Sequence, residues 1–220
     1  MADRTAVRTA ASKGRPRRRP DRALSAAKYD AKREQLVDVA AHVFARRGFH
    51  GTSIDDLVEA TGLTRGGLYH YIARKEDLLI AAHERFIEPL LDNARAIAAE
   101  ALPADEALRR LAHALMHDIA TYQDQVTVFL HEWRAIEHDP EWRHVREARR
   151  EFEWIIQSIL RRGTAEGLFT VRDPQLTCLG FLGMINYSYM WYRPRGPHSA
   201  EEIAEHFVEI FLSGIRPQVA

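Results

Sequence analysis

The sequence predicts an all-α protein in which a head of three helices is followed by a larger helical body. Apolar residues recur every three or four positions along most of the chain, which is the spacing of one buried helix face. No stretch alternates apolar and polar residues as a strand would, and no segment repeats. Capping residues, glycines and prolines divide the chain into nine predicted helices.

The first helix is predicted from about Ala31 to Arg47, and Gly48 ends it. Its apolar face consists of Leu36, Val39, Ala40, Val43 and Phe44. Residues 1–27 hold few large apolar side chains, so we expect a disordered arm there. The basic core of this arm is Lys13, Arg15, Arg17, Arg18, Arg19 and Arg22. Such an arm can follow DNA phosphates or enter a minor groove, although a solvated tail without a partner has the same composition.

Two short helices joined by a tight turn are predicted within residues 52–80. Thr52 and Asp55 stand three apart, in the manner of a capping box that starts the second helix. Gly62 lies where the chain must reverse, and a left-handed backbone costs little only for glycine. Thr64 can then cap the third helix.

The outer side of the third helix carries Arg65, Tyr69 and His70. Helix, glycine-containing turn and helix is the helix-turn-helix arrangement, whose second member enters the DNA major groove. Arg65, on its first turn, can reach guanine or a phosphate. Thr52 and Lys75 lie at helix N-termini, where backbone N–H groups favour a phosphate.

The run GLTRGGLYHYIARKEDLL resembles the recognition-helix signature of the TetR family of bacterial transcriptional regulators, and AAHVFARRGFHGTSIDDLVEATG resembles the two helices before it. The resemblance covers roughly residues 32–80. It implies that Tyr69 and His70 contact the DNA backbone, whereas we expect Tyr71 to pack inside the head. The predicted DNA-contacting set is Thr52, Thr64, Arg65, Gly66, Tyr69, His70 and Lys75.

This sequence departs from the family pattern at three positions. Gly66 and Gly67 replace residues of which at least one is usually not glycine, and each interior glycine costs about 1 kcal/mol in helix propensity. They offer no side chain for reading bases, so we expect specificity to concentrate on Arg65. Arg74 stands where the family commonly has a small capping residue.

The net charge of zero conceals a gradient along the chain. Residues 1–29 hold nine Lys or Arg against two Asp, residues 30–77 hold seven basic against eight acidic residues, and residues 78–220 hold 15 against 21. Positive charge therefore lies at the end expected to meet DNA.

No apolar run of 18 residues predicts a membrane span, and the N-terminus has no secretory apolar region. The lone Cys178 is consistent with a reducing cytoplasm, where we expect this chain.

The body is predicted to begin with a fourth helix near Arg74, in which Pro89 marks a kink or break. Further helices are expected from Pro103 to about Tyr122, from Asp124 to Glu137, from Asp139 and Pro140 to Gly163 or Gly167, from Leu176 to Tyr192, and from Ser199 to about Leu212. We expect a basic arm at residues 1–27, a helix-turn-helix DNA-binding domain at 28–76, and an effector-binding and dimerisation domain at 77–214.

The EGLF, WYRPRGP and FLSGI stretches resemble TetR-type regulators of fatty-acid and sterol-ring catabolism that respond to acyl-CoA thioesters. An acyl chain requires an apolar tunnel, and CoA phosphates require Arg at its mouth. The predicted ligand-binding set is Met116, Phe129, Trp133, Arg149, Arg150, Phe152, Ile156, Phe181, Met184 and Tyr187. Aromatic and Met residues at helical spacing also fit an ordinary core, and Arg-rich helices an ordinary solvated face.

The TetR resemblance also implies a homodimer held by the last two helices, at about 174–193 and 199–212. The apolar side chains expected to form its surface are Leu179, Leu182, Ile185, Phe207, Ile210 and Phe211. Two heads would then meet the two halves of a pseudo-palindromic operator. An internal use of these apolar faces would instead leave a monomer.

A repressor released from its operator by an acyl-CoA thioester is the function expected from these resemblances, and two alternatives fit the same residues. The sensor could take another hydrophobic molecule, such as a drug, flavonoid or lactone, or the protein could bind DNA without any effector. His113 and His117 have a spacing that suits a metal, but exposed histidines account for it, so no metal and no cofactor are expected. No nucleophile motif, phosphate loop or paired acidic motif indicates an enzyme.

Overall fold

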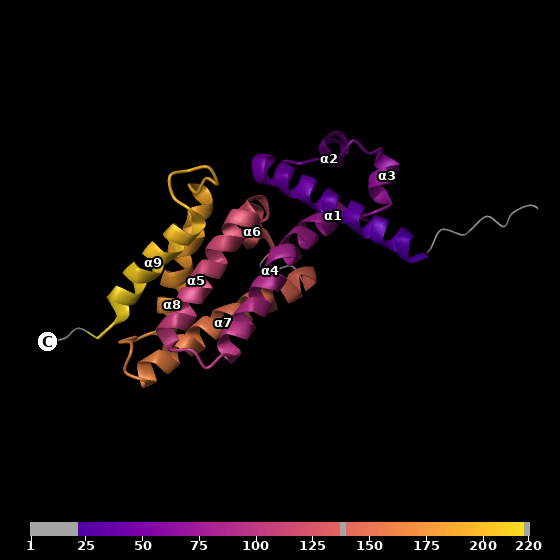
Figure 1. Ribbon diagram of the computed structural model, residues 1–220. Coiled ribbons are helices and arrows are strands. Elements are labelled where there is room, and N and C mark those ends of the chain that lie inside the picture. Colours follow the sequence, from indigo (N-terminus) through magenta and orange to yellow (C-terminus); the bar gives the residue numbers. More distant parts are fainter. Residues whose placement is uncertain (1–21, 137–139, 218–220) are drawn as a thin grey trace, which may run out of the picture.

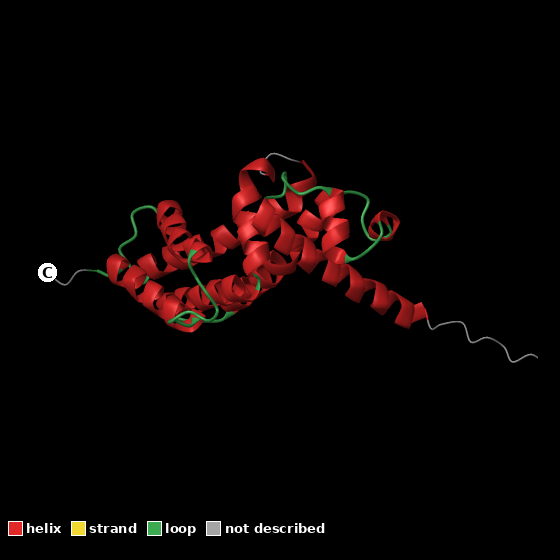
Figure 2. Cartoon of the chain, turned by 90° about the horizontal axis from the view of Figure 1, so that it is seen from above, coloured by secondary structure: helices red, strands yellow, loops and turns green. Residues whose placement is uncertain are grey.

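A computed structural model describes residues 22–136 and 140–217, and within them every regular element is a helix (Figure 2). Figure 1 shows α1–α3 at one end of the molecule, with α4 leading from this head into the body. The head elements are α1 (Arg22–Arg47), α2 (Ile54–Thr61) and α3 (Arg65–Tyr69). The body elements are α4 (Lys75–Ala99), α5 (Ala104–Thr121), α6 (Gln123–Ile136), the 3₁₀ turn η1 (Pro140–Trp142), α7 (Arg143–Ala165), α8 (Pro174–Asn186), the 3₁₀ turn η2 (Tyr187–Met190) and α9 (Ala200–Ile215). The all-α prediction is confirmed.

The head folds around a small apolar core. Its fully buried side chains include Leu36, Phe44, Leu57 and Leu68, contributed by α1, α2 and α3. Gly62 adopts a left-handed backbone with φ of 66°, and its N–H donates to the Val58 carbonyl. The predicted turn between α2 and α3 is therefore confirmed.

The start of α2 is capped differently from the prediction. Ser53, not Thr52, is the N-cap, and Ser53 and Asp56 form a reciprocal capping box. Thr52 is only 2% exposed, and its hydroxyl donates to the Gly48 carbonyl. The sequence offers two neighbouring hydroxyl residues, and packing on the end of α1 decides between them.

The first helix begins earlier than predicted, at Arg22 rather than Ala31. Residues 22–27 are therefore helical and do not belong to a disordered arm, and the predicted domain boundary at residue 28 falls inside α1. Ala, Leu and Arg, which make up most of this segment, have high helix propensity. The arm residues Lys13 to Arg19 lie outside the described residues.

Pro89 does not break α4, which continues to Ala99. Phe86, Ile87, Leu90 and Leu91 are buried on either side of the proline, whereas Pro89 itself is exposed. Burial of these flanking side chains outweighs the loss of one backbone hydrogen bond. The predicted domain boundary at residue 76 lies within the first turn of this helix.

The other body helices follow the predicted order with shifted ends. The α-helical part of α8 stops at Asn186 and continues as η2, while α7 starts at Arg143 after η1. The predicted cap Asp139 lies outside the described residues, but Asp173 caps α8 and Ser199 caps α9 with Glu202. The core helix is α5, which packs against α4, α6, α7, α8 and α9. Within the described residues, no helix is long and apolar enough to cross a membrane.

Candidate functional site

The helix α3 is short and is held at both ends. The Thr64 hydroxyl accepts a hydrogen bond from the Gly67 N–H at 3.0 Å, and Leu68 is fully buried beneath the helix. Arg65, Gly66, Tyr69 and His70 remain exposed, with Tyr69 at 45%. The predicted DNA-reading side of α3 therefore faces away from the protein, but the Thr64 oxygen is engaged in capping.

Arg65 already has an anionic partner. One of its guanidinium nitrogens lies 2.5 Å from the Asp55 carboxylate on α2, and both side chains are exposed. This ion pair links the Arg65 side chain on α3 to α2. Because the pair is solvated, a DNA phosphate or guanine can replace Asp55 at low cost.

Two predicted phosphate contacts are used inside the head. The Lys75 ammonium donates to the carbonyls of Phe49 and Thr52 at 2.8 Å each, and it lies 4.2 Å from the centroid of the Phe49 ring. Thr52 is buried, so its side chain does not meet solvent. Both residues fix the start of α2, and the exposed Ser53 takes the surface position expected of Thr52.

A residue that the sequence analysis does not single out supports the end of α3. Tyr29, on the N-terminal extension of α1, stacks on Tyr71 with ring centroids 4.9 Å apart and meets the edge of His70 at 5.6 Å. Its hydroxyl also lies 3.4 Å from the His70 carbonyl oxygen. The packing role predicted for Tyr71 agrees with this contact. No local signal identifies Tyr29, because its partners lie some 40 residues away in the chain.

The head is joined to the body through both α6 and α4, which pack against α1. Glu132 on α6 accepts the Phe49 N–H at 3.2 Å and lies 3.6 Å from the His50 imidazole. Nearer the start of α6, Asp124 pairs with His42 at 3.0 Å and Gln125 donates to Asp38 at 3.1 Å. An ion pair between Arg74 and Glu141 connects the start of α4 to η1.

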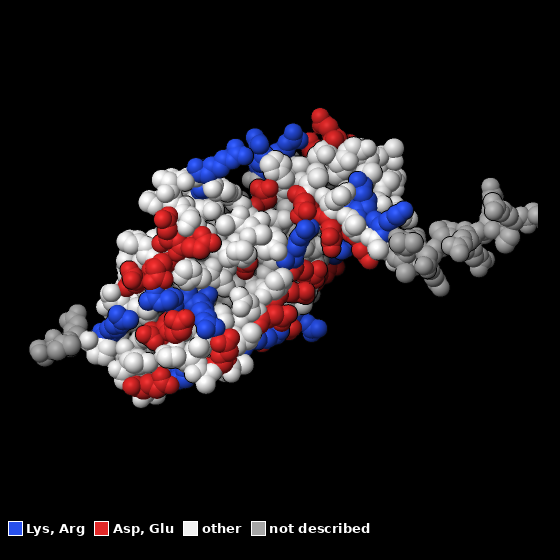
Figure 3. Space-filling view, viewed as in Figure 1, with Lys and Arg blue, Asp and Glu red and all other residues white. Residues whose placement is uncertain are grey.

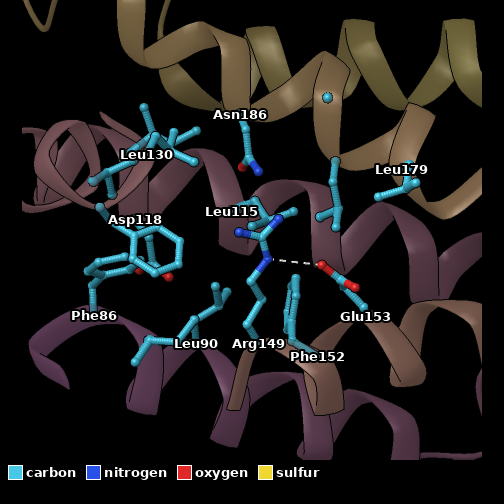
Figure 4. A pocket seen from close by; sticks show the side chains of 16 residues that line it. Phe86, Leu90, Leu115, Asp118, Leu130, Arg149, Phe152, Glu153, Leu179 and Asn186 are labelled. Carbon is cyan, nitrogen blue, oxygen red and sulfur yellow. Dashed lines mark hydrogen bonds and ion pairs between the residues drawn. The ribbon is translucent and has the colours of Figure 1, made fainter. Parts of the chain in front are cut away.

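An apolar cavity of about 250 Å³ lies among α4, α5, α6, α7 and α8 (Figure 4). Its lining residues are Phe86, Ile87, Leu90, Leu115, Asp118, Ile119, Val126, Phe129, Leu130, Arg149, Phe152, Glu153, Leu179, Leu182, Gly183 and Asn186. The helix α6 thus contributes Val126, Phe129 and Leu130 to the cavity and Glu132 to the head. A movement of the cavity wall can therefore reach the helix-turn-helix through the single helix α6.

The cavity adjoins a shallower hollow that is rich in arginine. This hollow is lined by Trp133, Arg146, Arg149, Arg150, Glu153 and Leu179. The Arg149 guanidinium stacks on Trp133, 4.1 Å from the ring centroid, and donates to Glu153 at 3.0 Å. Three of the six residues also line the apolar cavity, so the hollow and the cavity lie side by side and share Arg149, Glu153 and Leu179.

The predicted ligand-binding set divides into three groups. Phe129, Arg149 and Phe152 line the cavity, and Trp133 and Arg150 line the adjoining hollow. Met116, Ile156 and Phe181 are buried in the core without facing either space, and Met184 lines neither. Tyr187 is 63% exposed on the outer surface. These five residues therefore line neither space, and on α8 it is Leu179, Leu182, Gly183 and Asn186 that face the cavity instead.

Asp118 and Asn186 are polar cavity residues that the sequence analysis does not predict as ligand contacts. Burial raises the pKa of Asp118 to about 6, an effect that the neighbouring His117 partly offsets. Neither side chain has a hydrogen bond or ion pair among the described residues. An Asp next to HxxxH looks like ordinary helix-surface sequence, so only the packing of α5 reveals its position.

The outer sides of α8, η2 and α9 carry exposed apolar side chains. Leu176, Leu179, Tyr187, Met190, Trp191 and Ile210 are each between 42% and 66% exposed. Of the predicted dimer residues, Leu179 and Ile210 lie on this face and Phe207 is half-buried. Leu182, Ile185 and Phe211 instead belong to the core of the subunit, and this corrects the prediction. We call the exposed set the α8–α9 face.

On the lower part of the face shown in Figure 3, charges on the body do not form a broad patch of one sign. On the face seen in Figure 3, basic and acidic side chains alternate over the lower body. His113 is paired with Glu205 at 3.2 Å, and no group of three His, Cys, Asp or Glu suited to a metal occurs among the described residues.

Family models match both parts of the chain. One described as bacterial regulatory proteins of the tetR family matches residues 36–82, and one described as the tetracyclin repressor-like C-terminal domain matches residues 101–215. The HTH-type transcriptional repressor KstR2 of Mycobacterium tuberculosis is 27% identical over 191 residues, which are 86% of this chain and 96% of that protein.

Solved structures show the same fold. The ketosteroid transcriptional regulator KstR2 of Mycobacterium tuberculosis matches with a TM-score of 0.81 at 26% identity, over 85% of this chain and 96% of the other. The TetR family regulator PfmR of Thermus thermophilus matches with a TM-score of 0.72 at 31% identity, over 81% and 97%. AibR, solved in complex with isovaleryl coenzyme A and operator DNA, is alike in fold, with a TM-score of 0.73 at 23% identity over 81% and 97%.

Proposed function

The chain belongs to the TetR family of bacterial regulatory proteins, and from this premise we propose that it represses transcription as a homodimer on operator DNA and is released by an acyl-CoA thioester. The observation that carries the proposal is the apolar cavity beside an arginine-rich hollow with which it shares three lining residues. An acyl group suits the first, and the phosphates and adenine of CoA suit the second.

Contact with DNA is assigned to the exposed side of α3. Arg65, Tyr69 and His70 are its side chains, and the backbone at Gly66 allows close approach because a side chain there would meet nothing within 4 Å. Among the residues predicted to contact DNA, Thr64 acts by capping this helix, whereas Thr52 and Lys75 act by fixing the start of α2. Ser53 is added as a surface group at the α2 N-terminus, where a phosphate is favoured.

Dimerisation is assigned to the α8–α9 face. Exposed apolar patches of this kind are uncommon on monomers and mark interaction surfaces. Gly180 on α8 is exposed, and a side chain added there would meet nothing within 4 Å, so a partner helix can approach closely. A two-fold axis through this face would present two α3 helices to one DNA duplex.

Release is assigned to α6 and α4. A ligand among Phe129, Leu130 and Phe86 presses on both helices, and these same helices hold the head through Glu132 and Arg74. The ligand shifts the population toward a dimer geometry that no longer fits successive major grooves only if it binds that geometry more tightly.

The test measures binding to duplex DNA from the region upstream of the gene, by fluorescence anisotropy, with acyl-CoA thioesters of increasing size, the matching free acids and CoA alone. We expect thioesters to release the DNA and free acids to leave it bound. The double variant Arg149→Gln with Arg150→Gln should bind DNA normally and require about tenfold more thioester, since charge-assisted hydrogen bonds to phosphate are lost.

Arg161→Gln is the matched control, because Arg161 lies on the same helix but its guanidinium meets only Gln157. It should respond like the unaltered protein. Equal release by free acids would favour a sensor of other hydrophobic molecules. Tight DNA binding that no thioester of the panel disturbs would overturn the acyl-CoA assignment.

A further inference from the structure

The cavity contains polar groups that its apolar walls do not explain. Asp118 on α5 and Asn186 on α8 both line it, and neither side chain has a hydrogen bond or ion pair among the described residues. Most other lining residues are Leu, Ile, Val or Phe. Both side chains are half-buried, and polar groups that lose part of their contact with water usually have a partner in the protein.

The raised pKa of the Asp118 carboxyl is consistent with its lack of a hydrogen-bond partner. Burial raises the pKa of its carboxyl to about 6, and His117 offsets only part of that effect. On its outer side Asp118 also borders a groove with Asn93, His113 and Glu201. None of these groups is within hydrogen-bond or ion-pair distance of the carboxylate.

The polar groups lie at different places around the cavity. Figure 4 shows the Asn186 amide pointing inward from α8, toward the Arg149 guanidinium that rises from α7, while Asp118 lies farther along beside an aromatic ring. Asn186 and Arg149 supply hydrogen-bond donors, whereas an ionised Asp118 only accepts. A ligand that satisfies all three must offer an acceptor near Asn186 and a donor near Asp118.

We propose that the cavity selects acyl groups that carry a hydroxyl, with Asp118 accepting a hydrogen bond from that hydroxyl and Asn186 donating to the thioester carbonyl oxygen. This inference rests on the proposed acyl-CoA function. An ammonium group would also suit Asp118, and Arg149 does not exclude it because Glu153 lines the same space and pairs with this guanidinium at 3.0 Å, so the experiment includes an amine. The volume of about 250 Å³ favours a compact acyl group over a long chain.

The experiment compares cyclohexanecarbonyl-CoA with its 3-hydroxy and 4-hydroxy analogues, using quenching of tryptophan fluorescence and calorimetry on the full chain. We expect at least one hydroxylated thioester to bind about tenfold to a hundredfold more tightly than the parent, as a hydrogen bond to a charged group would give. A 4-amino analogue serves as the cationic alternative.

Two variants assign the preference to Asp118. Asp118→Leu should abolish or reverse the preference for the hydroxyl, whereas Asp92→Asn, an exposed carboxylate on α4, should keep it. Equal binding of all the analogues, tighter binding of the amine, or an unchanged preference in Asp118→Leu would each overturn the inference. Absence of binding by every thioester would instead contradict the proposed function, so the two failures are distinguishable.

Discussion

Polar side chains are treated differently in the head and in the cavity. In the head, the polar groups at helix ends meet nearby partners, as Ser53 meets Asp56 and Lys75 meets the carbonyls of Phe49 and Thr52. In the cavity, Asp118 and Asn186 have no partner among the described residues. The head is therefore organised before DNA arrives, whereas the cavity is left incomplete for a ligand.

The comparison implies opposite responses to mutation. Removing one of these polar groups at a helix end of the head should lower the free energy of unfolding, because each of them completes a contact. Removing a polar group from the cavity should cost little or increase stability, while it damages ligand response. A site that trades stability for function in this way is expected of a binding cavity.

The largest effect on stability is expected for Leu68→Ala, since Leu68 is fully buried under α3. Truncation of a buried Leu costs about 2–5 kcal/mol, measured as the free energy of unfolding in urea. Operator binding should be lost together with stability, because α3 is docked chiefly through this side chain. Leu168→Ala, at an exposed leucine outside both the head and the α8–α9 face, is the matched control and should leave the unfolding of the head unchanged. A Leu68→Ala variant of normal stability would contradict a pre-organised head.

The second prediction concerns Asp118 and pH. The pKa of Asp118 is raised from 3.8 to about 6 by burial, so between these values the folded protein binds more protons than the unfolded chain. This residue therefore destabilises the fold as pH rises through that window. Asp118→Asn should be more stable than the unaltered protein at pH 7, by on the order of 2 kcal/mol, and should lose this advantage near pH 4.

Because the protonation of His83 also changes with pH, the stabilities of Asp118→Asn and the unaltered protein must be compared with each other at each pH. Burial lowers the pKa of His83 to about 4, so the unfolded chain binds more protons there and stability rises with pH in an overlapping window. The two residues oppose each other in the total pH dependence, but subtraction of the Asp118→Asn curve isolates the carboxyl. Parallel curves for the two proteins between pH 4 and pH 7 would exclude an energetically costly Asp118.

The head was predictable from sequence because its signals are local. Gly48, Gly62 and Thr64 act within four residues of themselves through backbone angles and caps. Where two local candidates compete, as Thr52 and Ser53 do, packing decides and the prediction failed. The extension of α1 to Arg22 was missed because Arg, Ala and Lys are as common in disordered arms as in helices.

The sequence could predict an apolar cavity in the body, but it could not predict which residues line it. Five helices each contribute a few residues to it, so membership depends on which side of each helix turns inward. On α8 the residues Phe181 and Met184 have the composition expected of a ligand site, but Leu179, Leu182 and Asn186 occupy the inner positions. A uniformly apolar helix gives no periodic signal by which sequence could distinguish these two faces.

The smallest expected effect tests whether the N-terminal extension of α1 belongs to the organised head. Tyr29 stacks on Tyr71 and contacts His70 at the end of α3, and aromatic pairs contribute about 0.5–1.5 kcal/mol. Because Gly66 and Gly67 weaken α3, Tyr29→Ala should reduce operator affinity by about threefold to tenfold, measured by anisotropy at fixed salt. Tyr29→Phe keeps the stacked ring and should bind operator like the unaltered protein. If both variants bind equally well, α3 holds its position without the extension, and the organised head begins nearer to Leu36.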